Sequence, residues 1–208
     1  MPTSLRSAIA AFLFATALTV GCASAPASSG LHATPAGLGR LPYADADVDF
    51  MAGMIPHHAQ AVIMAGWAPS HGARKDVAIL CERIVVEQRD EIAMMQGWLR
   101  DRGQDVPDAT STRHKMKMNG MVHEMLMPGM MSDEEMAALD AARGPEFDRL
   151  FLIGMIKHHQ GAIDMVDVLF KAYGAAQDET VFKFATDVHA DQSIEIDRMH
   201  AMLENPQS

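Results

Sequence analysis

Two short segments of the chain each combine a methionine with two adjacent histidines, a donor set that can bind a soft metal ion. Met54-x-x-His57-His58 returns 101 residues later as Met155-x-x-His158-His159. On a helix, residues three or four positions apart share a face, so each thioether lies within one turn of an imidazole. Thioether and imidazole together suit copper, above all copper(I), whereas imidazole alone also suits zinc. The repeated pattern therefore predicts a copper site between the two copies.

A second repeated segment adds a carboxylate to each copy. Gln88-x-x-Glu91 returns as Gln192-x-x-Glu195, on an otherwise apolar helical stripe. An unpaired carboxylate or imidazole is costly in a protein interior, so these groups must contact one another or a cation. One interpretation is a polar network in which Glu91 and Glu195 accept hydrogen bonds from imidazoles and fix the helix register. The other is a metal site in which the two carboxylates orient or supplement the histidines.

The segment between the two copies is rich in methionine. Residues 105–131 contain Met116, Met118, Met121, Met125, Met127, Met130 and Met131, together with His114 and His123. Methionine is a flexible core filler, so this segment could pack over one end of a bundle. Spaced thioethers also bind copper(I) without needing a thiolate. We favour the second interpretation slightly, with ligands drawn from Met116, Met118, Met121, His123, Met125 and Met127.

A di-iron centre is the main alternative for a metal site in a helical bundle. Such bundles take a Glu from each of two helices and Glu-x-x-His from each of two others. The chain contains no Glu-x-x-His, and Asp197-x-x-His200 is its nearest substitute. Iron and zinc are therefore less favoured than copper. No nucleophile motif, phosphate loop or dinucleotide fingerprint indicates an enzyme.

These side chains need helices that hold them around a common interior. Apolar residues spaced three and four apart predict helices over about 45–66, 73–102, 145–173 and 178–204. A capping box of Ser132 and Glu135 begins a short helix over 132–143, and strands are nowhere signalled. The predicted fold is all-α, a four-helix bundle of two repeated helical hairpins. It forms one domain over 43–205, with repeats at 43–104 and 132–205 and the Met-rich connector at 105–131.

The N-terminal residues resemble an export signal. Arg6 precedes an apolar run over 8–20, and Leu18-Thr19-Val20-Gly21-Cys22 resembles a bacterial lipoprotein box. We expect a signal peptide over 1–21, lipidation of Cys22 and a flexible tether over 22–42, with ordinary cleavage after Ala25 as the competing interpretation. The expected location is the cell envelope, with membrane contact only through the lipid anchor.

Composition limits the class of partner. The formal net charge of −10 argues against nucleic acid and is compatible with cation binding. Cys22 and Cys81 are the only cysteines, so no internal disulfide is expected, and Cys81 reads as an inert core residue. Besides a metal ion, the expected partners are a copper-trafficking protein or a second copy of the chain.

These motifs together resemble the bacterial domain-of-unknown-function family 305 over most of Ala44 to Leu203. The matching segments are 50–64, 87–99, Met127-Pro128-Gly129-Met130 leading into 132–139, and 146–165. The resemblance implies a ferritin-like bundle, and some members are similar to exported copper-binding proteins of the CopM type, implicated in copper resistance. In one departure between the copies, Lys157 stands where the first copy has Pro56. It places a cation beside His158, which a metal site disfavours unless the long side chain carries the charge outward.

The sequence thus predicts an exported protein that buffers or passes copper in the cell envelope without catalytic turnover. Two alternatives stay open. One is a structural or interaction bundle with an internal His/Glu network, and the other is a ferritin-like iron or manganese metalloenzyme.

Overall fold

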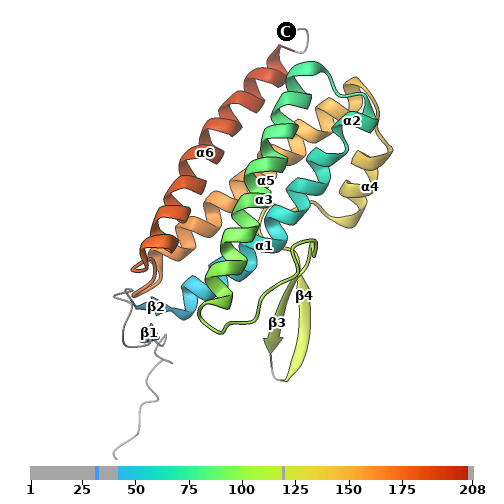
Figure 1. The fold of residues 1–208 in the computed structure, drawn as a ribbon. Coiled ribbons are helices and arrows are strands. Elements are labelled where there is room, and N and C mark those ends of the chain that lie inside the picture. Colours follow the sequence, from blue (N-terminus) through green and yellow to red (C-terminus); the bar gives the residue numbers. More distant parts are fainter. Residues whose placement is uncertain (1–30, 33–41, 119, 206–208) are drawn as a thin grey trace, which may run out of the picture.

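Four long helices lie side by side and form the body of the molecule (Figure 1). The computed structural model describes residues 31–32, 42–118 and 120–205. The long helices are α1 (Asp45–Gly66), α3 (Lys75–Arg100), α5 (Pro145–Lys171) and α6 (Glu179–Glu204). Helix α1 packs on α3, α5 packs on α6, and the two pairs meet along α1 and α5. The predicted all-α fold is confirmed, and each long helix lies within two residues of its predicted bounds.

Two short helices, α2 (Ala68–His71) and α4 (Asp133–Ala141), lie near one end of the bundle (Figure 1). The predicted capping box begins α4, since the Ser132 hydroxyl accepts from the Glu135 N–H at 3.2 Å and Glu135 Oε2 accepts from the Ser132 N–H at 2.7 Å. Asp178 caps α6 by accepting from the N–H groups of Thr180 and Val181. Side-chain oxygens at these positions satisfy N–H groups that have no partner within the helix.

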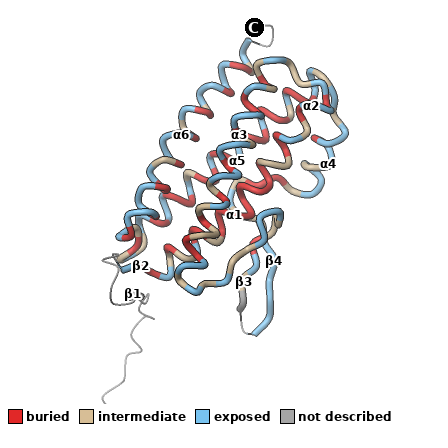
Figure 2. The backbone as a smooth tube through the Cα atoms, in the orientation of Figure 1, coloured by how far each residue is buried: buried red, intermediate tan, exposed pale blue. Residues whose placement is uncertain are grey.

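The inward faces of the helices form the core, which Figure 2 shows as buried stretches along their facing sides. The buried apolar side chains fall into two clusters. Met54 belongs to the first cluster, with Phe50 and Met95. Met155 belongs to the second, with Phe147. The two methionines of the repeated motif are therefore packed in different parts of the core.

The connector contains a β-hairpin, so the prediction that strands are absent is wrong. Strand β3 (His114–Met118) pairs antiparallel with β4 (Met121–Met125), and the hairpin projects from the side of the bundle (Figure 1). Its Met and His residues recur at every second position in both strands, which is the pattern of a strand. Asn119-Gly120 is also a strong two-residue hairpin signal, and Gly120 has φ of +77°. Methionine is not among the residues that favour strands, so the composition of this segment does not indicate a hairpin.

The N-terminal predictions fall mostly outside the described residues. The signal peptide over 1–21, lipidation at Cys22 and nearly all of the tether lie there. Within the tether, the described strand β1 (Leu31–His32) pairs with β2 (Tyr43–Ala44) just before α1. Among the described residues, no helix has the length and apolar character needed to cross a membrane.

Candidate functional site

Four histidines form a row through the centre of the bundle. His57 and His58 of α1 and His158 and His159 of α5 are all 0% exposed. The two inner rings, His57 and His158, lie with centroids 3.8 Å apart. Each outer ring lies farther from its neighbour, at 6.2 Å for His58 and 6.3 Å for His159. The contact between α1 and α5 thus brings two of the predicted ligands together and holds the other two at either end.

Every one of these histidines uses its Nε2 atom in a hydrogen bond. The outer rings bond to carboxylates, His58 to Glu91 Oε2 at 2.8 Å and His159 to Glu195 Oε2 at 2.7 Å. The inner rings bond to backbone carbonyl oxygens, His57 to that of Pro128 and His158 to that of His57, both at 3.0 Å. Since carbonyls and carboxylates accept, all four Nε2 atoms carry the proton.

The other ring nitrogen of each histidine is buried and has no hydrogen-bond partner. With the proton on Nε2, the neutral form of an imidazole presents an unprotonated Nδ1, which is the form that binds a metal. Burial lowers the pKa values of His57 and His158 well below the usual range, and the charges of neighbouring imidazoles lower them further. The two inner rings are therefore neutral at physiological pH.

The donors do not converge on one point. Among the described residues, no three His, Cys, Asp or Glu side chains gather in an arrangement that could hold a metal ion. Glu91 and Glu195 each lie beside a different outer histidine rather than together, as a di-iron site would require. Met54 and Met155 are fully buried in separate clusters. The interior geometry is that of a paired polar network.

A short crossing segment of the connector (Met127–Met131) packs across the bundle beside the inner histidines. The carbonyl of Pro128 accepts from His57, and the side chain of Gln60 both donates to and accepts from the Met131 backbone, at 2.9 and 2.7 Å. Gly161 permits the close approach, because a Cβ there would lie 2.0 Å from the Pro128 carbonyl oxygen. No motif in the sequence indicates that this segment lies beside His57.

The side chain of Lys157 extends to the surface, so its ammonium group lies away from the interior. Its ammonium lies 2.9 Å from both carboxylate oxygens of Glu135 in α4, and its side chain is 49% exposed. The neighbouring His158 ring remains fully buried. The cation is thus paired at the surface and does not enter the interior.

The hairpin arranges its soft donors in a row. The register sets His114 opposite Met125, Met116 opposite His123, and the Met118 Cα opposite that of Met121. Directly opposed residues and alternate residues along a strand share one side of a hairpin, so His114, Met116, Met121, His123 and Met125 face the same way. On the other side, Lys115 and Glu124 form an ion pair at 3.3 Å. All of β4 is exposed, with Met121 at 61% and Met125 at 46%.

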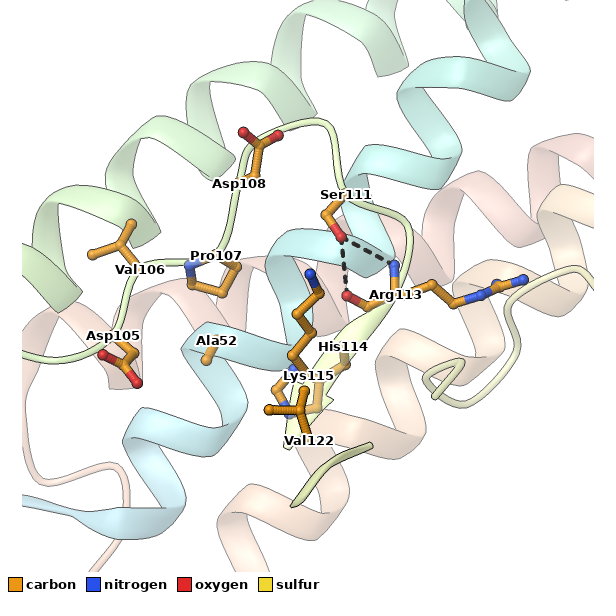
Figure 3. A pocket seen from close by; sticks show the side chains of 10 residues that line it. All are labelled: Ala52, Asp105, Val106, Pro107, Asp108, Ser111, Arg113, His114, Lys115 and Val122. Carbon is orange, nitrogen blue, oxygen red and sulfur yellow. Dashed lines mark hydrogen bonds between the residues drawn. The ribbon is translucent and has the colours of Figure 1, made fainter. Parts of the chain in front are cut away.

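His114 anchors the base of this row against α1. It is 8% exposed, and it bonds to the backbone of Ala52 while its Nδ1 has no partner. Burial lowers the pKa of His114, and the charge of Asp49 opposes that shift. Figure 3 shows His114 in the wall of a cavity of about 460 Å³, with Ala52 on α1 and Asp105 and Asp108 on the preceding loop. One end of the soft row is therefore sheltered and the other is open.

Comparison with known proteins places these features in context. The model of the family described as "Domain of unknown function (DUF305)" matches residues 47–203. Among curated proteins, none matches.

Several solved structures are similar in fold and sequence. A DUF305 protein of Streptomyces coelicolor, predicted to be secreted, is 27% identical with a TM-score of 0.65, covering 77% of this chain and 93% of its own. A DUF305 fragment from Deinococcus radiodurans is 28% identical with a TM-score of 0.62, covering 77% and 96%. CopM in its Cu(I)-bound form is 26% identical with a TM-score of 0.58, covering 78% and 98%. CopM has also been solved with Cu(II) and with silver.

Proposed function

The chain belongs to the DUF305 family, and from this premise we propose that it is an exported protein that binds copper, with copper(I) as the preferred form. The structures of CopM with copper and silver support this proposal, because they share the fold and about a quarter of the sequence. The likeness to a DUF305 protein predicted to be secreted supports export. In the cell envelope the protein would hold or pass copper, with no role in catalytic turnover.

The observation that carries the proposal is the pairing within the hairpin. Methionine faces histidine across the strands in two successive pairs, His114–Met125 and Met116–His123. Directly opposed side chains lie about 5 Å apart at Cβ, close enough for one ion to bind both donors. Copper(I) and silver(I) favour thioether and imidazole, whereas magnesium and calcium favour oxygen. The row is therefore selective for a soft ion by its composition.

The interior histidines favour a second role for the bundle itself. Each imidazole already has a partner on Nε2, and the two carboxylates lie at opposite ends of the row. We infer that this network fixes the register of α1 against α5, as a buried polar network does in other helical assemblies. The first binding site would then lie elsewhere. Further donors for a metal ion would be the unpartnered Nδ1 atoms of the four histidines and the sulfurs of two methionines, namely His57, His58, His158, His159, Met54 and Met155.

A copper(I) titration against a chromogenic chelator tests the proposal on the apo-protein. The quadruple variant Met116→Leu, Met121→Leu, His123→Asn and Met125→Leu removes four donors from the row. We expect its affinity to fall at least tenfold, about 1.4 kcal/mol. The matched control Lys115→Gln with Glu124→Gln changes the opposite side of the same strands and keeps wild-type affinity. Wild-type protein that cannot compete for copper(I) would overturn the function, and an unaffected quadruple variant would overturn the hairpin as its site.

The metal carried in the cell is a separate question with its own measurement. Elemental analysis of the protein isolated from its native envelope should find copper in excess of zinc and iron. Iron or manganese at one or two equivalents, with oxygen consumption on addition of iron(II), would favour the metalloenzyme instead.

A further inference from the structure

A second cavity opens beside the crossing segment, between the first turns of α1 and the last turns of α5. Its volume is about 280 Å³. The residues that matter for its chemistry are Phe50, Met127 and Met165, with the carboxylate residues Asp49 and Asp164. The cavity is thus mostly apolar, with two thioethers and two potential anions in its lining.

Gly53 makes room for the ends of these two methionines. A Cβ built on Gly53 would lie 2.7 Å from the Met127 Cε, 3.5 Å from the Met127 Sδ and 3.5 Å from the Met165 Cε. The methyl ends of the two side chains therefore approach the same point on α1 from different elements, the crossing segment and α5. Met165 is 7% exposed, so it is held by packing, while Met127 is only partly buried.

The same arrangement occurs once more, in a closed form. A Cβ on Gly154, 101 residues after Gly53, would lie 2.8 Å from the Met131 Sδ and 3.5 Å from the Met64 Cε. Here both methionines are buried, Met64 at 0% and Met131 at 5%. Two methionines over a glycine thus occur in both repeats, but Met127 reaches an open cavity whereas Met131 lies within the core.

The open pair lies next to the hairpin along the chain. Met127 follows Met125, the last residue of β4, by two positions, a span of at most about 7 Å of extended chain. Asp49 adds a spatial link, since it lines the cavity of Met127 and also acts electrostatically on His114. Met127 is therefore the first thioether along the chain after the hairpin.

We propose that Met127 and Met165 form a second copper(I) site, next to the hairpin and distinct from it, with Asp49 and Asp164 supplying negative charge at the cavity. This inference rests on the proposed function, because it assumes that soft ions reach the hairpin. Two thioethers are soft ligands that favour copper(I), and the apolar lining disfavours strongly hydrated ions such as magnesium. The crossing segment would thus supply a metal ligand, Met127, in addition to packing against the bundle.

Silver(I) provides a diamagnetic probe that takes the same ligands and does not undergo redox cycling. The full-length protein, labelled with ¹³C at the methyl carbons of its 18 methionines, is titrated with silver(I) and followed by NMR. Met127 and Met165 signals, assigned with single Met→Leu variants, should shift together after the hairpin signals. Shifts at the hairpin but not at Met127 and Met165 would overturn this inference alone. No methyl shift anywhere would overturn the proposed function.

A pair of double variants gives an independent test. Leucine has nearly the volume of methionine, so Met127→Leu with Met165→Leu preserves packing while removing both sulfurs. We expect this variant to bind one copper(I) fewer than the wild type. The matched control Met64→Leu with Met131→Leu makes the same change at the closed pair and should keep wild-type stoichiometry. An equal loss in both variants, or none in the first, would overturn the site.

Discussion

His158 donates from its Nε2 to the backbone carbonyl of His57 at 3.0 Å, and the two rings lie with centroids 3.8 Å apart. These residues occupy the same position in two repeats 101 residues apart. Both are fully buried, so a shift of α1 along α5 would break the bond where water cannot replace it. One imidazole pair thus ties the two helical hairpins together at the centre of the bundle.

Replacing His158 with alanine is expected to lower the free energy of unfolding by about 2–4 kcal/mol, since it leaves a buried carbonyl without a donor and opens a cavity. Urea denaturation measures the change. His123→Ala, on the exposed strand β4, should change stability by less than about 0.5 kcal/mol. Equal effects of the two substitutions would contradict a structural role for the central pair.

The two His/Glu pairs should differ in strength. The side chain of Glu195 is 6% exposed and that of Glu91 is 29% exposed. Glu195→Ala is therefore expected to cost about 2–3 kcal/mol, and Glu91→Ala about 1 kcal/mol, because water can replace the partner of His58 more easily. Denaturant midpoints of the two variants test this order, which a larger loss for Glu91→Ala would reverse.

Stability should fall as the pH drops through the range in which free histidine titrates. Burial lowers the pKa values of His57 and His158, so below about pH 6.5 the unfolded chain binds protons that the folded protein does not. Each such histidine contributes a slope of about 1.4 kcal/mol per pH unit below that value, and the contribution is complete above it. Urea titrations between pH 5.5 and 7.5 measure the slope. The pKa of His114 is also lowered, so His158→Gln should reduce the slope by about a third to a half, and a slope unchanged in that variant would contradict the assignment.

Gly161 should tolerate no side chain. An added Cβ would lie 2.0 Å from the Pro128 carbonyl oxygen, so the crossing segment would have to move. Gly161→Ala is expected to cost about 1–3 kcal/mol. Gly66→Ala, also in a helix but with nothing within 4 Å, should instead be neutral or stabilise by up to about 1 kcal/mol. Thermal or urea unfolding of both variants measures the difference. If Gly161→Ala is as stable as the wild type, the crossing segment does not lie against Gly161.

The Cys81 thiol should be unreactive in the folded protein. It is 1% exposed, and burial raises its pKa to about 12, so almost no thiolate forms at neutral pH. In a Cys22→Ser background, iodoacetamide at pH 7.5 is expected to label Cys81 only after denaturation. Rapid labelling of the native protein would contradict its burial.

The helices could be read from the sequence because local signals fix them. Ser132 with Glu135 forms a capping box, and the apolar periodicity locates the long helices to within two residues. The inward position of the histidines follows from the same periodicity. The carboxylate partners of the outer histidines, Glu91 and Glu195, are also indicated by the repeated motif. The partner of His57 is not, since its bond to Pro128 depends on where a segment 71 residues away crosses the bundle.

The hairpin was missed for a different reason. The alternation from His114 to Met118 is visible in the sequence, as is Gly120 at the turn, but methionine has no strong preference for strands. The pairing of Met127 with Met165 was beyond sequence reasoning, because it needs both the crossing segment and the space over Gly53.

Gln60 and Gly161 occupy matching places in the two halves, and they show why the halves had to become different. The single crossing segment contacts the two repeats differently. Gln60 forms hydrogen bonds to its backbone, whereas Gly161 has no side chain and leaves room for it. A glutamine at both positions would make the two repeats more alike, but its side chain at position 161 would collide with the Pro128 carbonyl and displace the segment. Divergence at this position is thus a steric requirement of having two repeats share a single connector.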